Sequence, residues 1–415
     1  MHYRELNSPR EPIGVIEPNP IFDCMETEST EKELHTTRPI NVLLVAPSLD
    51  IIGGQSRQAI RLREAFACEP QINVGFLPHN PRLPRLLRFL QRIKYVRTIV
   101  TTIHYCLLLF FKIPKYDIVH TFSASYYSYL FTAAPAILVA RLFRKQSIIN
   151  YRSGEAEDHL ANWKLTAKPI IRLATAIVTP SGYLVDVFEK FGLKAQAIYN
   201  IVELERFPYR ERRELTPVFL VSRLLEPLYN VACVLRAFSL IQQKYPEAKL
   251  TVAADGWLRP QLEALARELK LRDTKFVGFV PFDKMPELYN ATDIYLTATE
   301  IDNMPSSITE CMASGVPVVT TNAGGIPYIV THEETCLMVP TNDHAAMAQA
   351  AFRLLEEPGL AVQIASKARE ASKRFTSEGA RTEWLSLYQE LTSNKLISAS
   401  PRHSVKSMSA HETGN

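Results

Sequence analysis

Two carboxylates, Asp302 and Glu310, stand eight residues apart around a pair of serines, and they are the clearest candidates for a chemical role in this sequence. Carboxylates accept hydrogen bonds from the hydroxyl groups of a sugar. Ser306 and Ser307 stand where a helix is expected to begin, and they can cap it. The free N–H groups and the positive dipole end of that helix attract a diphosphate. The segment therefore suits a phosphorylated ligand that is rich in hydroxyl groups.

Glycines mark the turns in the residues that follow Glu310. Residues 315–317 (Gly-Val-Pro) end the helix and start a valine-rich strand, which leads to the pair Gly324-Gly325. The same pattern fits an ordinary helix and strand of an α/β core, with Glu310 only complementing the helix dipole. Both interpretations place a helix and the strand 317–321 within residues 302–325.

Short runs of Val, Ile and Leu alternate with helical segments from Asn41 onward, and this predicts parallel sheets covered by helices on both faces. The pattern restarts after the charged stretch 203–213, which we interpret as a linker. Two such units place a cleft at the carboxyl ends of their strands, where open α/β sheets bind ligands. The predicted strands are 41–47, 72–77, 117–121, 147–151 and 176–179, then 217–221, 249–253, 275–277, 293–297 and 317–321.

Together these features resemble the retaining glycosyltransferases of the GT-B fold and of the family 4 type, also called group 1. The family signature is a carboxylate, seven residues and a glutamate, followed by Gly-x-Pro-Val-Val and Gly-Gly, and Asp302 and Glu310 take its two acidic positions. The resemblance implies a GT-B architecture, with two doubly wound, Rossmann-like α/β domains facing a cleft. Further similar segments are Gly53–Gln55, Asn200–Phe207, Val221–Leu224, Ala254–Gly256 and Val277–Val280.

The domain organisation follows from the restart of the pattern and from the resemblance. Polar, proline-punctuated ends predict mobile tails. The resemblance adds that the last helix packs back on the N-terminal domain. The predicted parts are a tail over 1–38, an acceptor-side domain over 39–212, a donor-binding domain over 213–376, the returning helix over 377–392 and a tail over 393–415.

The resemblance also implies a role for individual residues. Glu310 would bind ribose hydroxyls, Arg223 would hold the diphosphate and Asp302 would position the sugar. Catalytic roles fall on Asp302, Arg223 and Glu310, donor binding on Arg223, Asn230, Val280, Asn303, Ser306, Ser307 and Glu310, and acceptor binding on Gly53, Gly54, Arg152 and Glu155.

Other assignments also have alternatives. An isolated arginine in the place of Arg223 is more often a surface ion-pair partner, and Gly53-Gly54 alone signals only a turn. Asn230 can bind a phosphate, or it can cap the helix that starts there. Arg152 follows a strand at the cleft and can bind an acidic acceptor or the donor phosphates. Alternatively, Arg152 pairs with Glu155 or Glu157.

The expected activity is transfer of a sugar from a nucleotide-sugar to a saccharide or lipid-linked acceptor with retention of configuration, as in polysaccharide or glycolipid synthesis. Three positions depart from the family. Leu228 replaces the usual lysine five residues after Arg223, Tyr328 replaces a glutamate and Arg152 replaces a histidine. These departures keep two alternatives open, a non-catalytic sugar-nucleotide-binding protein and an epimerase or phosphorylase of the same fold.

The composition is that of a globular protein of two ordinary domains, with 415 residues of which 47% are hydrophobic. The net charge of +4 is too small to indicate nucleic acid as a partner. Six cysteines lack the paired spacing of a zinc site or a disulfide framework. The N-terminus lacks a secretory signal. We therefore expect a cytoplasmic protein that needs no metal or other cofactor.

Residues 82–115 contain eight Lys and Arg residues and no acidic residue, interleaved with large apolar side chains. The apolar run 105–111 is shorter than the about 20 residues that a spanning helix needs. One interpretation is a basic amphipathic helix on an anionic bilayer, at the inner face of the membrane, which favours a lipid-linked acceptor. The other is a pair of core-packing helices with solvated arginines.

Overall fold

The structure is a computed structural model and describes residues 38–49, 53–93 and 95–399. Residues 1–37 of one predicted tail, and residues 400–415 of the other, lie outside the described residues. Two parallel six-stranded sheets lie within residues 40–339. This confirms the predicted fold class of two doubly wound α/β units.

The first sheet has the strand order β2-β1-β3-β4-β5-β6, and every neighbouring pair is parallel. All six residues of β3 are buried, because helices cover both faces of a parallel sheet. The strands are β1 (Ile40–Ala46), β2 (Ile72–Pro78), β3 (Ile118–Ser123), β4 (Gln146–Tyr151), β5 (Ala176–Thr179) and β6 (Gln196–Ala197).

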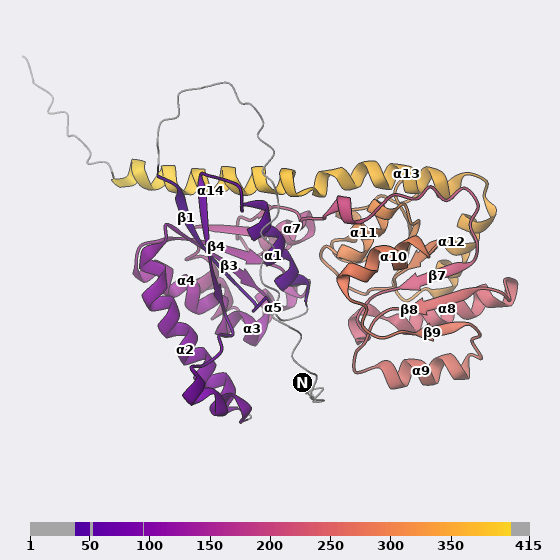
Figure 1. Cartoon of the computed structure of the whole chain (residues 1–415), viewed down its shortest axis with the longest axis horizontal. Coiled ribbons are helices and arrows are strands. Elements are labelled where there is room, and N and C mark those ends of the chain that lie inside the picture. Colours follow the sequence, from indigo (N-terminus) through magenta and orange to yellow (C-terminus); the bar gives the residue numbers. More distant parts are fainter. Residues whose placement is uncertain (1–37, 50–52, 94, 400–415) are drawn as a thin grey trace, which may run out of the picture. The chain divides into compact units, whose positions relative to one another are not determined.

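Helices pack on both faces of this sheet (Figure 1). On one face, Trp384 and Tyr388 of the C-terminal helix α14 (Ser377–Ala399) share a core with Val42 and with α1. On the other face, Tyr105 of α2 packs with Val45 and with α4. The helices are α1 (Gly54–Ala65), η1 (Arg85–Arg92), α2 (Val96–Lys112), η2 (Ile113–Lys115), α3 (Tyr126–Phe131), α4 (Ala133–Leu142), α5 (Ala156–Asn162), α6 (Ala167–Ile171), α7 (Gly182–Lys190) and η3 (Leu204–Arg206).

The second sheet has the strand order β12-β11-β10-β7-β8-β9 and is also parallel. The order reverses between β7 and β10, which are neighbours although three strand positions separate them in the chain. The strands are β7 (Val218–Val221), β8 (Lys249–Val252), β9 (Thr274–Phe276), β10 (Ile294–Leu296), β11 (Val318–Thr321) and β12 (Leu337–Val339).

Two apolar cores flank the second sheet. Helices α8, α9 and α12 contribute to one core, and α10 and α11 contribute to the other. The helices of this half are η4 (Pro227–Tyr229), α8 (Val231–Lys244), α9 (Arg259–Glu268), η5 (Phe282–Lys284), α10 (Met285–Asn290), α11 (Ser306–Ser314), η6 (Ile326–Tyr328), α12 (His344–Glu356), α13 (Leu360–Ser372) and η7 (Lys373–Phe375).

The structure differs from the expectations at the shortest strands and at the last helix. Strands β6 and β12 were not predicted, although β9 and β10, which have three residues as β12 does, were. Helix α14 continues to Ala399, so the prediction that the helix ends at 392 is wrong. Residues 393–399 contain no proline or glycine that would end a helix.

Candidate active site

Two side chains of opposite charge meet where the strand order of the second sheet reverses. Arg223 follows β7, Asp302 follows β10, and their side chains form an ion pair. Ligands of open α/β sheets bind in the crevice at such a reversal. Only 13% of the Arg223 side chain and 14% of the Asp302 side chain are exposed. The pair therefore lies at the predicted ligand crevice and is largely shielded from bulk water.

The glycine pair of the motif holds the loop that carries Asp302. Gly324 has a φ of +54°, and a Cβ there would overlap the carbonyl oxygen of Asp302. A Cβ at Gly325 would overlap the carbonyl oxygen of Asn303. The Gly325 N–H donates to the Asp302 carbonyl oxygen at 2.7 Å. The two glycines thus permit the close backbone approach that fixes this loop.

Arg223 is held as a permanent cation. Burial lowers the pKa of Arg223, but Asp302 and nearby tyrosine hydroxyls raise it, and the net direction is upward. The guanidinium carbon lies 4.3 Å from the ring centroid of Tyr229, which adds a cation–π contact. The Arg223 Nε is buried and has no hydrogen-bond partner in the described part of the chain. A planar cation with an unused donor suits a phosphate oxygen.

The turn after Arg223 brings no second cation. Leu228 lies in η4, where its carbonyl oxygen accepts the Glu300 N–H at 2.9 Å. Asn230 caps α8, because its side-chain oxygen accepts the Cys233 N–H at 3.2 Å. Its amide nitrogen donates to Asn342 at 2.6 Å. Both ends of the Asn230 side chain are thus engaged, which favours the capping alternative over phosphate binding.

The helix after Asp302 begins one residue earlier than a cap by Ser306 requires. Its N-cap residue is Pro305, and no side chain caps it. The prediction that Ser306 and Ser307 cap this helix is therefore wrong, since they are its first two residues. A proline here is compatible with the helix start because it has no N–H to satisfy. The Ile308 N–H donates to the Pro305 carbonyl oxygen at 3.2 Å, whereas the N–H groups of Ser306 and Ser307 lack partners within the helix, as a diphosphate site requires.

Asn303 and Met304 attach this loop to residues from the first half of the chain. The Ser181 hydroxyl, at the start of α7, donates to Asn303 Oδ1. The Asn303 Nδ2 is buried without a hydrogen-bond partner. Asn200 Nδ2 donates to the Met304 carbonyl oxygen at 3.2 Å. Asn303 therefore keeps an amide donor available beside the predicted sugar position.

Glu310 points into a buried polar cluster and is only 3% exposed. Its Oε2 accepts a hydrogen bond from the Tyr289 hydroxyl at 2.9 Å. Its Oε1 lies 4.0 Å from Nη2 of Arg61, a residue of α1. Arg61 was not predicted from the sequence. The sequence signal for its burial was its position next to Leu62, between the apolar positions of a helix.

The protonation of Glu310 predicts a pH dependence of nucleotide binding. Burial raises the pKa of Glu310 above its ordinary value of 4.5 and outweighs the lowering by Arg61 and by the Tyr289 hydrogen bond. A protonated carboxyl group is a poorer acceptor for ribose hydroxyls, so affinity for a nucleoside diphosphate should fall as the pH drops through the raised pKa. Calorimetric titrations between about pH 8 and about pH 5 measure this fall.

Glu310→Gln is the control for this prediction, because glutamine stays neutral at every pH. The variant should bind more weakly and show a flatter pH profile. An equally steep profile in the variant would show that another group causes it. The charged and titratable neighbours to compare are Arg57, Arg61, Glu203, Tyr289 and Cys311.

The effect of the raised pKa of Glu310 on folding stability has the opposite sign to its effect on nucleotide binding. A raised pKa favours the neutral form in the folded state. Glu310 therefore contributes most to the free energy of unfolding below pH 4.5, and progressively less as the pH rises to its folded pKa.

Two other predicted positions lie at the rim of the second half. Val280 is partly buried and packs against the core that contains Ile308. Its role beside the nucleotide base stays a prediction. Tyr328 donates a hydrogen bond to Asp186 of α7, so the residue in place of the family's glutamate contacts the first half of the chain.

The predicted acceptor glycines precede and begin α1. An added Cβ would meet no atom within 4 Å at Gly53 or at Gly54. The φ of Gly53 is extended, so the backbone there does not require glycine. Their role in acceptor binding stays a prediction.

Arg152 is bound by amides and not by carboxylates. It donates to Asn150 Oδ1 at 3.3 Å and to Asn200 Oδ1. Within the described residues, neither Glu155 nor Glu157 forms an ion pair with Arg152, so that alternative is wrong; Glu157 pairs with Lys190 at 3.2 Å. Burial lowers the pKa of Arg152 to about 9. Arg152 has no counter-ion within the described residues, so the interpretation that it binds an anion stays open.

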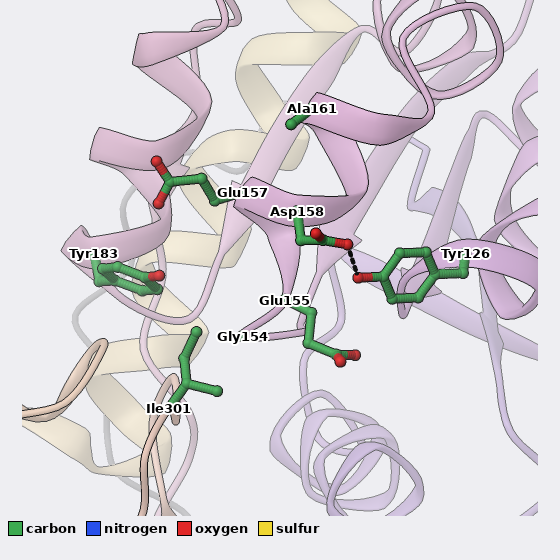
Figure 2. A pocket seen from close by; sticks show the side chains of 8 residues that line it. All are labelled: Tyr126, Gly154, Glu155, Glu157, Asp158, Ala161, Tyr183 and Ile301. Carbon is green, nitrogen blue, oxygen red and sulfur yellow. Dashed lines mark hydrogen bonds between the residues drawn. The ribbon is translucent and has the colours of Figure 1, made fainter. Parts of the chain in front are cut away.

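A cavity of about 560 Å³ lies between the loop after β4 and the loop that carries Asp302. Glu155, Glu157 and Asp158 line it with carboxylates, as Figure 2 shows, and the Tyr126 hydroxyl donates to Asp158. The second loop contributes Ile301. Burial and the nearby Asp158 raise the pKa of Glu155. The lining residues are Tyr126, Gly154, Glu155, Glu157, Asp158, Ala161, Tyr183 and Ile301, none of them basic.

Comparisons with known proteins agree with this arrangement. Residues 204–371 match the family model described as Glycosyl transferases group 1. The chain is 27% identical over 263 residues to glycogen synthase of Mycobacterium tuberculosis, an alignment that covers 59% of this chain and 62% of that protein. The match thus spans less than two thirds of the relative's length.

Solved structures show the same fold. A crystal structure of Anabaena HepE in complex with UDP and glucose is similar with a TM-score of 0.66 at 16% identity, covering 85% of this chain and all of that one. Sucrose-phosphate synthase from Thermosynechococcus elongatus gives a TM-score of 0.65 at 18% identity, covering 86% and 100%. With the two parallel sheets, the crevice at the strand-order reversal and the family match over residues 204–371, the chain resembles the group 1 glycosyltransferases and has a GT-B architecture.

Proposed function

We propose that this protein transfers a glycosyl unit from a nucleotide-sugar donor to a saccharide or lipid-linked acceptor, with retention of the donor's anomeric configuration. The observation that carries the proposal is the enclosed Arg223–Asp302 pair at the strand-order reversal of the second sheet. UDP and glucose in the HepE structure, and the name of the glycogen synthase relative, support a nucleotide-sugar donor and a saccharide acceptor.

Different side chains bind the two parts of the donor, its diphosphate and its sugar. The donor diphosphate binds the unused donors of Arg223 and the first turn of α11, which stabilise the charge that develops on the leaving group. Asp302, on its fixed loop, orients the sugar. The acceptor hydroxyl oxygen bonds to the anomeric carbon as the bond from that carbon to the phosphate oxygen breaks. The leaving phosphate takes the hydroxyl proton.

The cavity in Figure 2 favours a neutral acceptor. Glu155, Glu157 and Asp158 offer carboxylate oxygens to sugar hydroxyls, and Tyr126 and Tyr183 offer aromatic rings. The same carboxylates repel phosphate and uronate groups. We therefore expect that the sugar presenting the attacking hydroxyl is uncharged, even where a lipid phosphate is attached farther along the acceptor.

Nucleotide binding and turnover separate this proposal from its alternatives. Purified protein is incubated with a mixture of nucleotide sugars, and mass spectrometry identifies the nucleotide that is consumed. Release of a nucleoside diphosphate that depends on an acceptor supports transfer. Binding without consumption would support a non-catalytic protein, and an isomerised nucleotide sugar or a sugar phosphate product would support an epimerase or a phosphorylase.

We also propose that the protein binds the surface of an anionic membrane. The apolar-basic face of η1 and α2 exposes large apolar side chains, namely Leu86, Leu87, Phe89, Ile99, Ile103, Leu107, Phe110 and Phe111. Exposed basic residues on the same segment are Arg85, Arg88, Arg92 and Lys115. Apolar side chains of this size favour the interface of a bilayer, and the basic ones favour anionic lipids.

The buried side of α2 argues for a surface position. Residues Val96–Lys115 are long and apolar enough to cross a membrane, so the expectation that this segment is too short is wrong. However, Tyr105 and Leu109 belong to the core of the first sheet, and the Tyr105 hydroxyl donates to the Thr132 carbonyl oxygen at 2.8 Å. A crossing helix would have to give up this packing.

Vesicle binding tests the apolar-basic face. The double variant Ile103→Asp and Leu107→Asp should bind phosphatidylglycerol vesicles at least about tenfold more weakly, because it removes two inserted side chains worth about 1.5–3 kcal/mol each when fully buried. Sedimentation with vesicles measures this. Leu165→Asp is the matched control, since Leu165 is 92% exposed outside this face. Equal binding by the double variant would rule the face out.

A further inference from the structure

Two buried polar atoms beside the predicted donor site lack hydrogen-bond partners among the residues that the structure describes, and they lie close together. They are Nη2 of Arg61 in α1 and Oε1 of Glu310 in α11. The atoms are 4.0 Å apart, which is too far for a hydrogen bond. Arg61 is 2% exposed and Glu310 is 3% exposed. Buried polar atoms without partners are costly, so this gap calls for an explanation.

The other atoms of both side chains are fixed. Arg61 Nε donates to Glu203 at 2.8 Å, and Nη1 donates to the Ile201 carbonyl oxygen at 2.8 Å. Glu310 Oε2 accepts from Tyr289 at 2.9 Å. Neither side chain can therefore turn to close the gap without straining or losing a hydrogen bond.

A hydroxyl group, of a sugar or of water, fits the gap. Its hydrogen goes to Glu310 Oε1 while its oxygen accepts from Arg61 Nη2, so both unpartnered atoms are satisfied at once. Two hydrogen bonds of about 2.8 Å that meet at one oxygen at roughly a right angle end on atoms about 4 Å apart. A phosphate oxygen would be repelled by Glu310, and an ammonium group would be repelled by Arg61.

We propose that Arg61 binds the same ribose hydroxyl of the donor as Glu310, so that both halves of the chain hold the nucleotide. This inference rests on the proposed function, which assigns Glu310 to the ribose. Because both side chains are buried, the ribose arrives while α1 and α11 are apart, and its hydroxyl bridges them when they close. Arg61 is then a donor-binding residue that selects for a ribose hydroxyl.

The test compares nucleotides that differ by one hydroxyl group. Calorimetry measures the Kd of the full chain for whichever of UDP, ADP and GDP binds best, and for its 2′-deoxy and 3′-deoxy forms. In the unsubstituted protein, loss of the bridging hydroxyl should weaken binding by about 10- to 100-fold, because hydrogen bonds to two charged groups are lost. In Arg61→Met this penalty should be at least about threefold smaller. Arg61→Lys, which keeps the charge, should give an intermediate penalty.

Arg206→Met is the matched control. Arg206 is an exposed arginine that stacks on the ring of Phe282, as Arg61 does, and its loss should leave the penalty unchanged. Thermal unfolding checks each variant, and Arg61→Lys carries the test if Arg61→Met does not fold. Arg61 variants that bind the nucleotide with the full penalty would overturn this inference alone. Failure of the unsubstituted protein to bind any of the three nucleotides would overturn the proposed function with it.

Discussion

Asp302→Asn is expected to lower kcat for glycosyl transfer by about 10²- to 10³-fold, the loss typical of removing one preorganised electrostatic group. The substitution keeps the shape of the side chain and an oxygen for the Asn303 N–H, which Asp302 accepts at 2.7 Å. It removes the negative charge that orients the sugar and that holds Arg223 in position. Arg223 stays a cation in this variant and still binds the diphosphate, so KM should change by less than about threefold.

Initial rates of nucleoside diphosphate release measure this effect. Glu300→Gln is the matched control, since it makes the same charge change two residues away on an exposed side chain and should leave kcat within about twofold. Asp302→Asn with a kcat equal to that of the unsubstituted protein would remove Asp302 from the active site.

Arg223→Met is expected to have the larger effect, with kcat/KM lowered by about 10³-fold or more. Arg223 is the cation at the strand-order reversal, and Leu228 stands where the family's second cation is expected, so this turn offers no substitute. The variant also leaves Asp302 as a largely enclosed carboxylate without its counter-ion. Both KM and kcat should therefore deteriorate.

Arg223→Lys should recover part of the loss, because it restores the charge without the planar fork of donors. Arg259→Met is the control for loss of an arginine in the same half of the chain, since Arg259 pairs with Glu263 on α9 at 2.8 Å. A kcat/KM of Arg223→Met within about threefold of that of Arg259→Met would contradict the role of Arg223.

Most of the fold could be predicted from the sequence, because the strands of a parallel sheet are continuous apolar runs between helices. Val42 to Ala46 and Val318 to Thr321 have this pattern and form central strands. The strand within the motif residues 302–325 was predicted at 317–321 for the same reason, and it is β11 (Val318–Thr321). Strands β6 and β12 were missed because their pairing depends on neighbouring strands and not on a pattern of their own.

The candidate site could be predicted only where residues follow strands. Arg223 and Asp302 were each identified, but their ion pair depends on β7 and β10 being neighbours, which strand order alone decides. Arg61 was missed because the tertiary fold brings α1 to Glu310. Ser306 and Ser307 were misjudged as caps because Pro305 takes the capping position.

Transfer of a labelled sugar is the most direct test of the central claim that the Arg223–Asp302 crevice binds and activates a nucleotide-sugar. The purified full chain is incubated with a panel of nucleotide sugars and with neutral and phosphorylated saccharide acceptors, and products are identified by mass spectrometry and NMR. We predict a new glycosidic bond to a neutral acceptor, with the anomeric configuration of the donor, and its loss in Arg223→Met. Unchanged product formation by Arg223→Met, or a product of inverted configuration, would contradict the account.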